Sequence, residues 1–128
     1  MTIAFACILF MGILPIICAG ISKKGFAGYD NSRPREWLAK QTGFRARANA
    51  AQANTFESLP LFFAAVIIAS FANAPQGRVD LLALTFVIAR CLYVLCYLAD
   101  WPTLRTIVWT VGFISVLALF LQLSLIHI

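Results

Sequence analysis

The run RANAAQANTFESLP, from Arg47 to Pro60, leads into an apolar segment, Leu59 to Ala72, that contains no charged residue. This run places Asn54 and Glu57 where a membrane helix is expected to begin. A carboxylate carried to the bilayer centre costs about 2.5–3.5 kcal/mol. An acid at such a boundary therefore indicates either a partner side chain or a bound polar ligand. The rest of the sequence helps to decide between the two.

The composition is that of an integral membrane protein. The chain has 128 residues, of which 62% are hydrophobic and 12% charged, and its mean hydropathy is +0.88. Soluble domains are about 45–50% apolar, and a soluble core could not absorb so much apolar surface at this length. We expect one membrane domain that covers residues 1–128.

Four segments are long enough to cross the roughly 30 Å of hydrocarbon in a bilayer. The expected spans are residues 3–21, 55–73, 79–99 and 107–126. The first is expected to be a retained helix, because it lacks the basic start of a signal peptide. The second helix should begin near Thr42 to Arg45, ahead of the bilayer, and Pro60 should kink it just past Glu57. The predicted fold class is an all-α membrane protein with a four-transmembrane-helix bundle.

The basic residues are unevenly distributed along the chain. Seven of the ten lie between the first two spans, and they are Lys23, Lys24, Arg33, Arg35, Lys40, Arg45 and Arg47. The positive-inside rule therefore predicts that this loop, residues 22–54, is cytoplasmic. Within it, Arg35 to Gln41 is expected to form a short helix with Pro34 in its first turn. Nucleic acid is not an expected partner, because the cluster flanks a membrane helix and lacks interleaved aromatic residues.

The cysteines and the histidine do not suggest a metal site. Cys91 and Cys96 have a spacing that matches no metal motif, and Cys7 and Cys18 lie three turns apart on one expected helix. His127, the only histidine, stands at the end of the sequence. We interpret the thiols as small buried hydrophobic groups and expect no metal.

Polar side chains are expected to gather at the cytoplasmic half of the bundle. Helical spacing brings the members of two groups onto one face each: Arg47, Asn54 and Glu57 on the second helix, and Arg90, Tyr93 and Tyr97 on the third. Arg105 stands at the start of the fourth helix. Arginine pairs with carboxylates, and asparagine offers both a donor and an acceptor. A small anionic ligand that carries amides would suit this set, and glutathione, with its carboxylates, ammonium, amides and thiol, fits it.

A purely structural interpretation of the same residues stays open at this point. Glu57 would then neutralise Arg90 or Arg47, and the tyrosines would be interface aromatics. Arg105 would be a topology charge, and Asn49 and Gln52 would be packing or headgroup residues.

The sequence resembles the MAPEG family, the membrane-associated proteins in eicosanoid and glutathione metabolism. The AxxNxxE core at Ala51 to Glu57 with the following Pro60 is similar to the most recognisable stretch of that family. The set Arg90, Tyr93, Tyr97 and Arg105 resembles its third helix and the turn after it. Tyr29 to Asn31, followed by Pro34-Arg35, is similar to a bacterial branch, which implies a bacterial inner membrane.

The resemblance implies a homotrimer that binds glutathione between neighbouring protomers, near the cytoplasmic side. It also implies conjugation of glutathione to lipophilic electrophiles or reduction of lipid peroxides. Carried over by position, Arg105 would stabilise the thiolate of glutathione as the catalytic residue. The residues that would bind glutathione are Asn54, Glu57, Tyr97, Arg47, Tyr93, Arg90 and Thr106.

The chain also departs from the pattern of this family. Ala50 and Ala53 stand where several family enzymes carry arginines, and Tyr93 stands where some members have a histidine. The alternative function is therefore a non-catalytic MAPEG-like protein that binds a lipid or a partner protein in the same groove. Of the two hypotheses we favour the enzyme. A transporter would need polar residues through the full membrane depth, and the first and fourth spans offer almost none.

Overall fold

The fold is a bundle of four long helices with one short helix at its edge. In a computed structural model, residues 2–23 and 32–127 are described, with side chains up to residue 122. The helices are α1 (Ile3–Ser22), α2 (Pro34–Ala39), α3 (Gly43–Phe71), α4 (Gln76–Leu98) and α5 (Pro102–His127). The four long helices are each long and apolar enough to cross a membrane. The predicted all-α, four-span architecture is confirmed.

The helix boundaries follow the local sequence signals. α3 begins at Gly43, as expected from the run before the second span, and its 29 residues continue through Pro60. At about 1.5 Å per residue, α3 is roughly 43 Å long and exceeds the hydrocarbon thickness. α5 begins at Pro102, earlier than the expected span, because the fixed φ of proline suits the first helical turn. α2 confirms the expected short helix, whereas Tyr29 to Asn31 lie outside the described residues.

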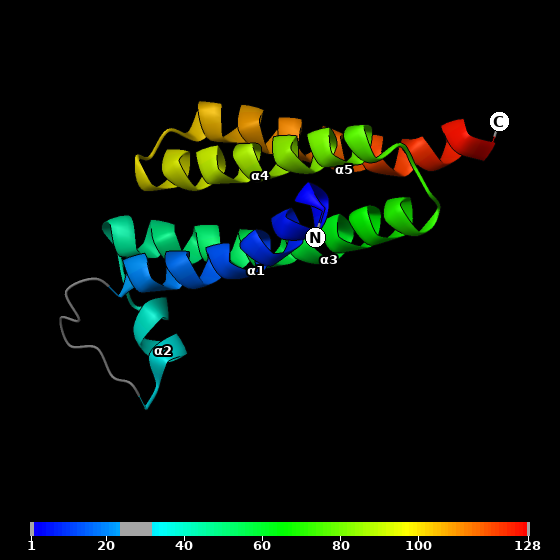
Figure 1. Cartoon of the computed structure of the whole chain (residues 1–128). Coiled ribbons are helices and arrows are strands. Elements are labelled where there is room, and N and C mark those ends of the chain that lie inside the picture. Colours follow the sequence, from blue (N-terminus) through cyan, green and yellow to red (C-terminus); the bar gives the residue numbers. More distant parts are fainter. Residues whose placement is uncertain (1, 24–31, 128) are drawn as a thin grey trace.

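The long helices form two layers, α1 with α3 and α4 with α5 (Figure 1). α3 also packs against α4 and α5, and α1 also packs against α4. In the core, the Phe62 and Phe86 rings stack with their centroids 4.2 Å apart. A Cβ placed on Gly112 would lie 3.4 Å from the Cβ of Ala89, so α4 and α5 approach closely there. Small residues allow such close approach in membrane bundles.

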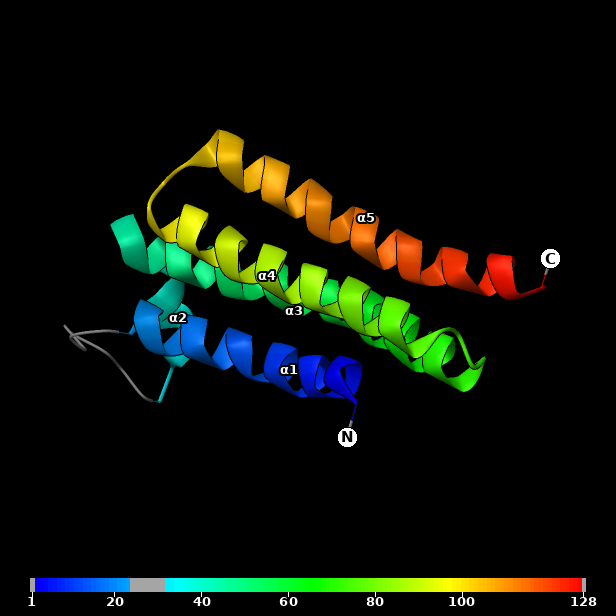
Figure 2. The ribbon, with the colours of Figure 1, turned by 45° about the horizontal axis from the view of Figure 1, so that its top comes forward.

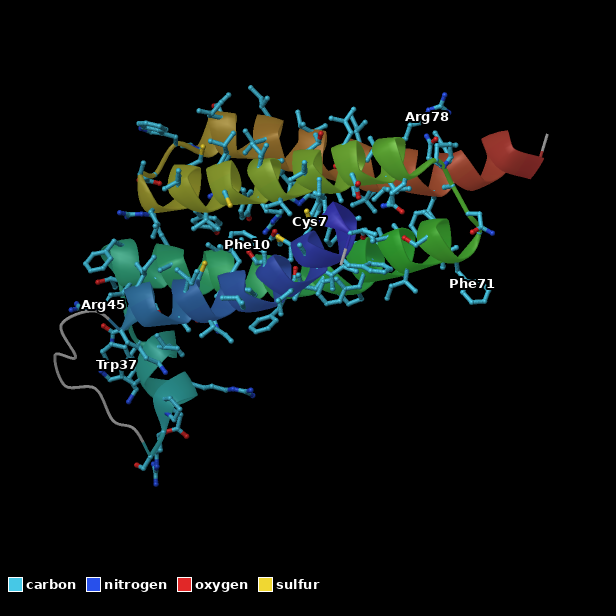
Figure 3. All side chains as sticks on the ribbon, viewed as in Figure 1. Cys7, Phe10, Trp37, Arg45, Phe71 and Arg78 are labelled. Carbon is cyan, nitrogen blue, oxygen red and sulfur yellow. The ribbon has the colours of Figure 1, made fainter. Side chains whose placement is uncertain are left out.

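The two ends of the bundle differ. α2 and the turn between α4 and α5 lie at the same end, which we call the α2 end, and the turn between α3 and α4 lies at the other (Figure 2). Trp37 and Arg45 are at the α2 end, whereas Phe71 and Arg78 are at the opposite end (Figure 3). The two turns contain the left-handed residues Asn73 and Asp100, with φ of 59° and 60°. Asparagine and aspartate tolerate this conformation better than most residues.

Asp80 of α4 joins this helix to the N-terminus of α1. Its Oδ1 accepts hydrogen bonds from the backbone N–H of Ala4 at 2.9 Å and from the side chain of Gln76 at 2.8 Å. Thr2 accepts a further bond from the N–H of Phe5 at 3.1 Å. The first N–H groups of a helix have no partner within the helix, and the helix N-terminus favours a nearby negative charge. Asp80 therefore fixes the N-terminus of α1 against α4.

Replacement of Asp80 by alanine should lower the stability of the bundle. Asp80→Ala removes the acceptor from the Ala4 N–H, which costs about 1–2 kcal/mol. In detergent solution this should lower Tm by roughly 5 °C. Asp80→Asn keeps an acceptor oxygen and should lower Tm by less than half as much. An equal loss in both variants would show that the carboxylate charge, and not the hydrogen bond, stabilises α1.

Candidate functional site

A cavity of about 190 Å³ lies between α3, α4 and α5. One part of its wall is polar and is formed by Asn54, Glu57, Ser58 and Arg90. The rest is apolar and is formed by Leu61, Phe86, Trp109, Phe113 and Val116. The structure thus brings together three of the site residues predicted from the sequence, Asn54, Glu57 and Arg90, and sets them against an aromatic wall.

Arg90 is the most deeply placed charged group of this cavity, with 2% of its surface exposed. Its Nη2 donates to the Thr55 hydroxyl at 2.9 Å, which in turn donates to the carbonyl of Ala51 at 2.7 Å. Its guanidinium carbon lies 4.1 Å from the centroid of the Tyr93 ring. Its Nε is buried and has no hydrogen-bond partner among the described residues. An unpartnered buried donor on a cation is costly, so this N–H is available to a hydrogen-bond acceptor.

Arg90 begins a row of four stacked side chains, Arg90, Tyr93, Tyr97 and Arg105, which we call the Arg90–Arg105 array. The rings of Tyr93 and Tyr97 meet edge to face with centroids 5.6 Å apart. The Arg105 guanidinium lies 4.3 Å from the centroid of the Tyr97 ring. Such cation–π contacts gain strength when they are desolvated. The array extends from the cavity to the α2 end and brings three more of the predicted residues into contact.

Glu57 is exposed on the surface of the single chain and lines the cavity. At about 1.5 Å per residue, it lies roughly 21 Å from Phe71 along α3, and Arg90 lies roughly as far from Gln76 along α4. The two residues thus lie at similar heights along the two apolar helices. Among the described residues the one ion pair is Arg33 with Glu36, at 3.6 Å. Neutralisation of Glu57 by Arg90 or Arg47 is therefore not seen within this part of the chain.

Asn54 and Tyr93 connect the cavity to its surroundings. The Oδ1 of Asn54 is buried without a hydrogen-bond partner among the described residues, and it therefore calls for a donor. The Arg90 guanidinium covers the Tyr93 ring, and the Tyr97 ring meets Tyr93 edge to face. Tyr93 therefore links the cavity to the rest of the array.

Arg47 and Thr106 are not among the residues that line the cavity. The Nε and Nη2 of Arg47 donate to the carbonyl of Leu98 at 3.4 and 3.3 Å. This contact places a cation at the C-terminus of α4, where the helix dipole favours it. The Thr106 hydroxyl donates to the carbonyl of Pro102 at 3.1 Å. Both side chains thus have local structural contacts, and their predicted part in glutathione binding stays a prediction.

Two features of the site were not predicted from the sequence, the aromatic wall and the partner of Arg90. Trp109 and Phe113 of α5 stack with their ring centroids 5.3 Å apart and an interplanar angle of 8°, and both line the cavity. The sequence did contain a signal for this wall. Arg105, Trp109 and Phe113 are spaced by four, and residues four apart share a helix face. Thr55 lies between Asn54 and Glu57 and was not predicted as the partner of Arg90.

A second cavity of about 280 Å³ lies between α2 and α3 and is lined by Arg35, Leu38, Asn49, Gln52, Ala53 and Phe56. The Oε1 of Gln52 is buried there without a partner among the described residues. The four cysteines are free, and Cys7, Cys18 and Cys96 are buried. No group of three or more potential metal ligands occurs in the described part of the chain.

The comparison with known families identifies the chain. The model of the MAPEG family matches residues 1–125. The chain belongs to the MAPEG family. No match was found among curated proteins or among solved structures. This family is associated with glutathione and its members are generally oligomeric. Together with its four membrane-spanning helices, the match makes the chain an integral multi-pass MAPEG protein.

The Thr55 hydroxyl should be necessary for the burial of Arg90 in this MAPEG protein. Thr55→Val preserves shape but removes the acceptor for Nη2, which leaves a second unpartnered donor on a buried cation. A hydrogen bond to a charged group contributes about 1.5–3 kcal/mol, so Tm should fall by roughly 5–10 °C. Thr55→Ser keeps the hydroxyl and should stay close to the wild type. Equal Tm values for Thr55→Val and Thr55→Ser would contradict this role.

Proposed function

We propose that this MAPEG protein is a glutathione-dependent transferase or peroxidase that acts on lipophilic electrophiles or lipid peroxides. The observation that carries the proposal is the cavity between α3, α4 and α5. Its polar end, with Asn54, Glu57 and Arg90, meets an apolar wall, and the Arg90–Arg105 array extends from it to the α2 end. Such a site suits a water-soluble thiol next to an apolar substrate.

The polar groups complement glutathione in charge and in hydrogen bonding. Glu57, which lacks an ion pair among the described residues, would accept from the ammonium group. The unpartnered Oδ1 of Asn54 would accept from the ammonium or from an amide N–H. Tyr97 would donate its hydroxyl proton to a carboxylate without adding charge in the membrane.

Arg105 would hold the thiolate of glutathione. A free thiol has a pKa of about 8.5, so it is mostly protonated at neutral pH. A neighbouring guanidinium favours the anion, and each unit by which it lowers the pKa of glutathione is worth about 1.36 kcal/mol. Arg105 is half-buried and stacked on Tyr97, so its charge is held in place and is only partly screened by water.

The position of Glu57 supports a homotrimer with glutathione between protomers. In the single chain, this carboxylate is exposed at a depth where lipid would surround it, and an ionised acid is costly there. A neighbouring copy and a bound ligand would remove it from lipid. Members of the family are generally oligomeric, which agrees with this arrangement.

The proposed orientation puts the α2 end in the cytoplasm of a bacterial cell, with the chain in the inner membrane. Residues 22–54 would then be cytoplasmic, since most basic residues belong to them and the positive-inside rule applies. Glutathione would enter at this end. The lipophilic substrate would enter laterally, since Leu61, Trp109 and Phe113 line the cavity and are exposed.

The second candidate function is a non-catalytic protein that binds a lipid or a partner protein in the same groove. Ala50 and Ala53 favour it, because they leave α3 without further cations beside Asn54. In that case a lipid, and not glutathione, would raise Tm, since a ligand that binds the folded state stabilises it.

Arg105→Ala should abolish thiolate formation. Stopped-flow absorbance of the purified protein mixed with glutathione should show a thiolate signal in the wild type and none in Arg105→Ala. The rate of conjugation in the variant should rise only at a pH about one unit or more higher, because the bound thiol then ionises nearer its free pKa. Arg78→Ala, at the opposite end of the bundle, serves as control. A full thiolate signal in Arg105→Ala would rule out this role.

Glu57→Gln should weaken glutathione binding without loss of the fold. Glutathione at about 100 times its Kd should stabilise the wild type by roughly 2.7 kcal/mol. Removal of a charged partner should reduce affinity about tenfold, which corresponds to about 1.4 kcal/mol. The thermal shift caused by glutathione should therefore be about halved in Glu57→Gln. Glu36→Gln, an acid of α2 paired with Arg33, should keep the full shift. No shift in the wild type would favour the non-catalytic alternative.

A further inference from the structure

We infer that the second cavity, between α2 and α3, holds the headgroup of an anionic phospholipid that carries free hydroxyl groups, as phosphatidylglycerol does. Arg35 pairs with the phosphate, and Gln52 accepts a hydrogen bond from a headgroup hydroxyl. The acyl chains lie along the exposed apolar residues of α3 that begin at Phe56. We call this the α2–α3 cavity. The inference does not rest on the proposed function.

The α2–α3 cavity lies on a different face of α3 from the cavity between α3, α4 and α5. Four residues of α3 line it, and their spacing puts them on one helix face: Asn49, Gln52, Ala53 and Phe56. At about 100° per residue, Asn54 and Glu57 point roughly a third of a turn away around the helix. A ligand in one cavity therefore does not occupy the other within the same chain.

The charge of the α2–α3 cavity favours an anion. Among the described residues that line it, Arg35 alone is charged. Arg35 is exposed and forms no ion pair in this part of the chain, since the nearby Glu36 pairs with Arg33 instead. Arginine binds phosphate through two parallel hydrogen bonds, and basic pockets at a membrane surface attract anionic lipids. A zwitterionic headgroup would add a second cation where no carboxylate lines the wall.

The amides of the cavity favour a headgroup with hydroxyl groups. The Oε1 of Gln52 is buried without a hydrogen-bond partner among the described residues, and an unpaired buried acceptor is costly. A glycerol hydroxyl can donate to such an oxygen. It can also accept from an amide N–H, and Asn49 offers both kinds of group. A choline headgroup has no N–H or O–H and would leave Gln52 unpaired.

The size of the cavity suits a headgroup and excludes enclosed acyl chains. A dry cavity of about 150 Å³ accommodates a benzene molecule. The α2–α3 cavity measures about 280 Å³, so by proportion it has room for a phosphate esterified to one glycerol. The chains of the lipid must then lie outside it, against the surface of the bundle.

The same face of α3 changes from polar to apolar along the helix, as a phospholipid does. Beyond Asn49 and Gln52 it continues with Phe56 and Ile67, which are 48% and 53% exposed. Gln52 lies roughly 28 Å from Phe71 along α3, which is close to the roughly 30 Å of hydrocarbon in a bilayer. With Phe71 at one boundary of the hydrocarbon, Gln52 would stand at the other, where lipid headgroups begin.

The headgroup preference can be measured by native mass spectrometry of the purified protein in detergent. The wild type should bind phosphatidylglycerol roughly tenfold more tightly than phosphatidylcholine, which lacks both the net charge and the hydroxyls. Phosphatidylethanolamine, which has a donor but no net charge, should bind with intermediate affinity. Equal binding of all three lipids would show only a non-selective lipid layer and would overturn the inference.

The part of Arg35 can be separated from general attraction to the basic end of the bundle. Arg35→Gln should weaken the binding of phosphatidylglycerol about tenfold. Lys40→Gln removes the same charge from an exposed residue of the same end that does not line the cavity, and it should change the affinity less than about twofold. Because Arg35 is exposed, its replacement should leave the fold intact. Equal effects of the two variants would contradict a phosphate site at Arg35.

The part of Gln52 can be tested with phosphatidylmethanol, an anionic phospholipid whose headgroup has no hydroxyl. The wild type should bind phosphatidylglycerol about fivefold more tightly than phosphatidylmethanol. Gln52→Leu should bind the two lipids equally, with its affinity for phosphatidylmethanol unchanged. A preference for phosphatidylglycerol that persists in Gln52→Leu would contradict the hydrogen bond from the headgroup.

Two competitors distinguish the lipid from other occupants of the cavity. Glycerophosphoglycerol, the headgroup without acyl chains, should displace phosphatidylglycerol only weakly, and equal affinity would make the cavity a site for a soluble anion. Glutathione should leave the binding of phosphatidylglycerol unchanged, and displacement would assign the cavity to glutathione between copies of the chain. Either result would overturn the inference. Selective lipid binding without any glutathione-dependent turnover would leave it standing, and the proposed function alone would fail.

Discussion

The burial of the Arg90 guanidinium is the constraint on which the rest of this bundle depends. A cation within the hydrocarbon is tolerated only where the protein supplies polar and aromatic partners. Here Thr55 reaches it from α3 and Tyr93 covers it from α4. The hydrogen bond to Thr55 joins α3 to α4. The two helices bring Asn54, Glu57 and Arg90 to one cavity, and Tyr97 of α4 lies against Arg105 of α5.

The sequence predicted the architecture well, because apolar length alone identifies spans in a bilayer. It also predicted the early start of α3 and the short α2. Hydropathy could not say which aromatic residues of α5 face inward, since Trp109 and Phe113 resemble lipid-facing residues until α3 and α4 are packed against them. Nor could helical spacing foresee that Arg47 would reach the carbonyl of Leu98. Such contacts depend on how the ends of helices meet, which no periodicity within one helix encodes.

The sequence predicted that polar residues gather in one half of the bundle. It did not predict which of these side chains contact each other. Glu57 and the arginines looked like natural ion partners, yet in the described residues of the single chain Glu57 remains unpaired while Arg90 uses a hydroxyl and a ring. Charge complementarity within one chain is therefore incomplete at this site. A bound ligand or a neighbouring subunit would supply the groups that this chain lacks, because charged and polar groups across an interface are complementary.

The hydrogen bond between Ala4 and Asp80 joins segments from opposite parts of the sequence. A ribosome releases the first helix long before it has made the acid that caps it. α1 and α3, which pack extensively on each other, can pair in the bilayer during that interval. The cap can form only after α4 has been inserted, and until then the leading turn of α1 lacks its carboxylate partner. Biogenesis of this bundle thus has a built-in order, in which the N-terminus is secured by one of the later segments to enter the membrane.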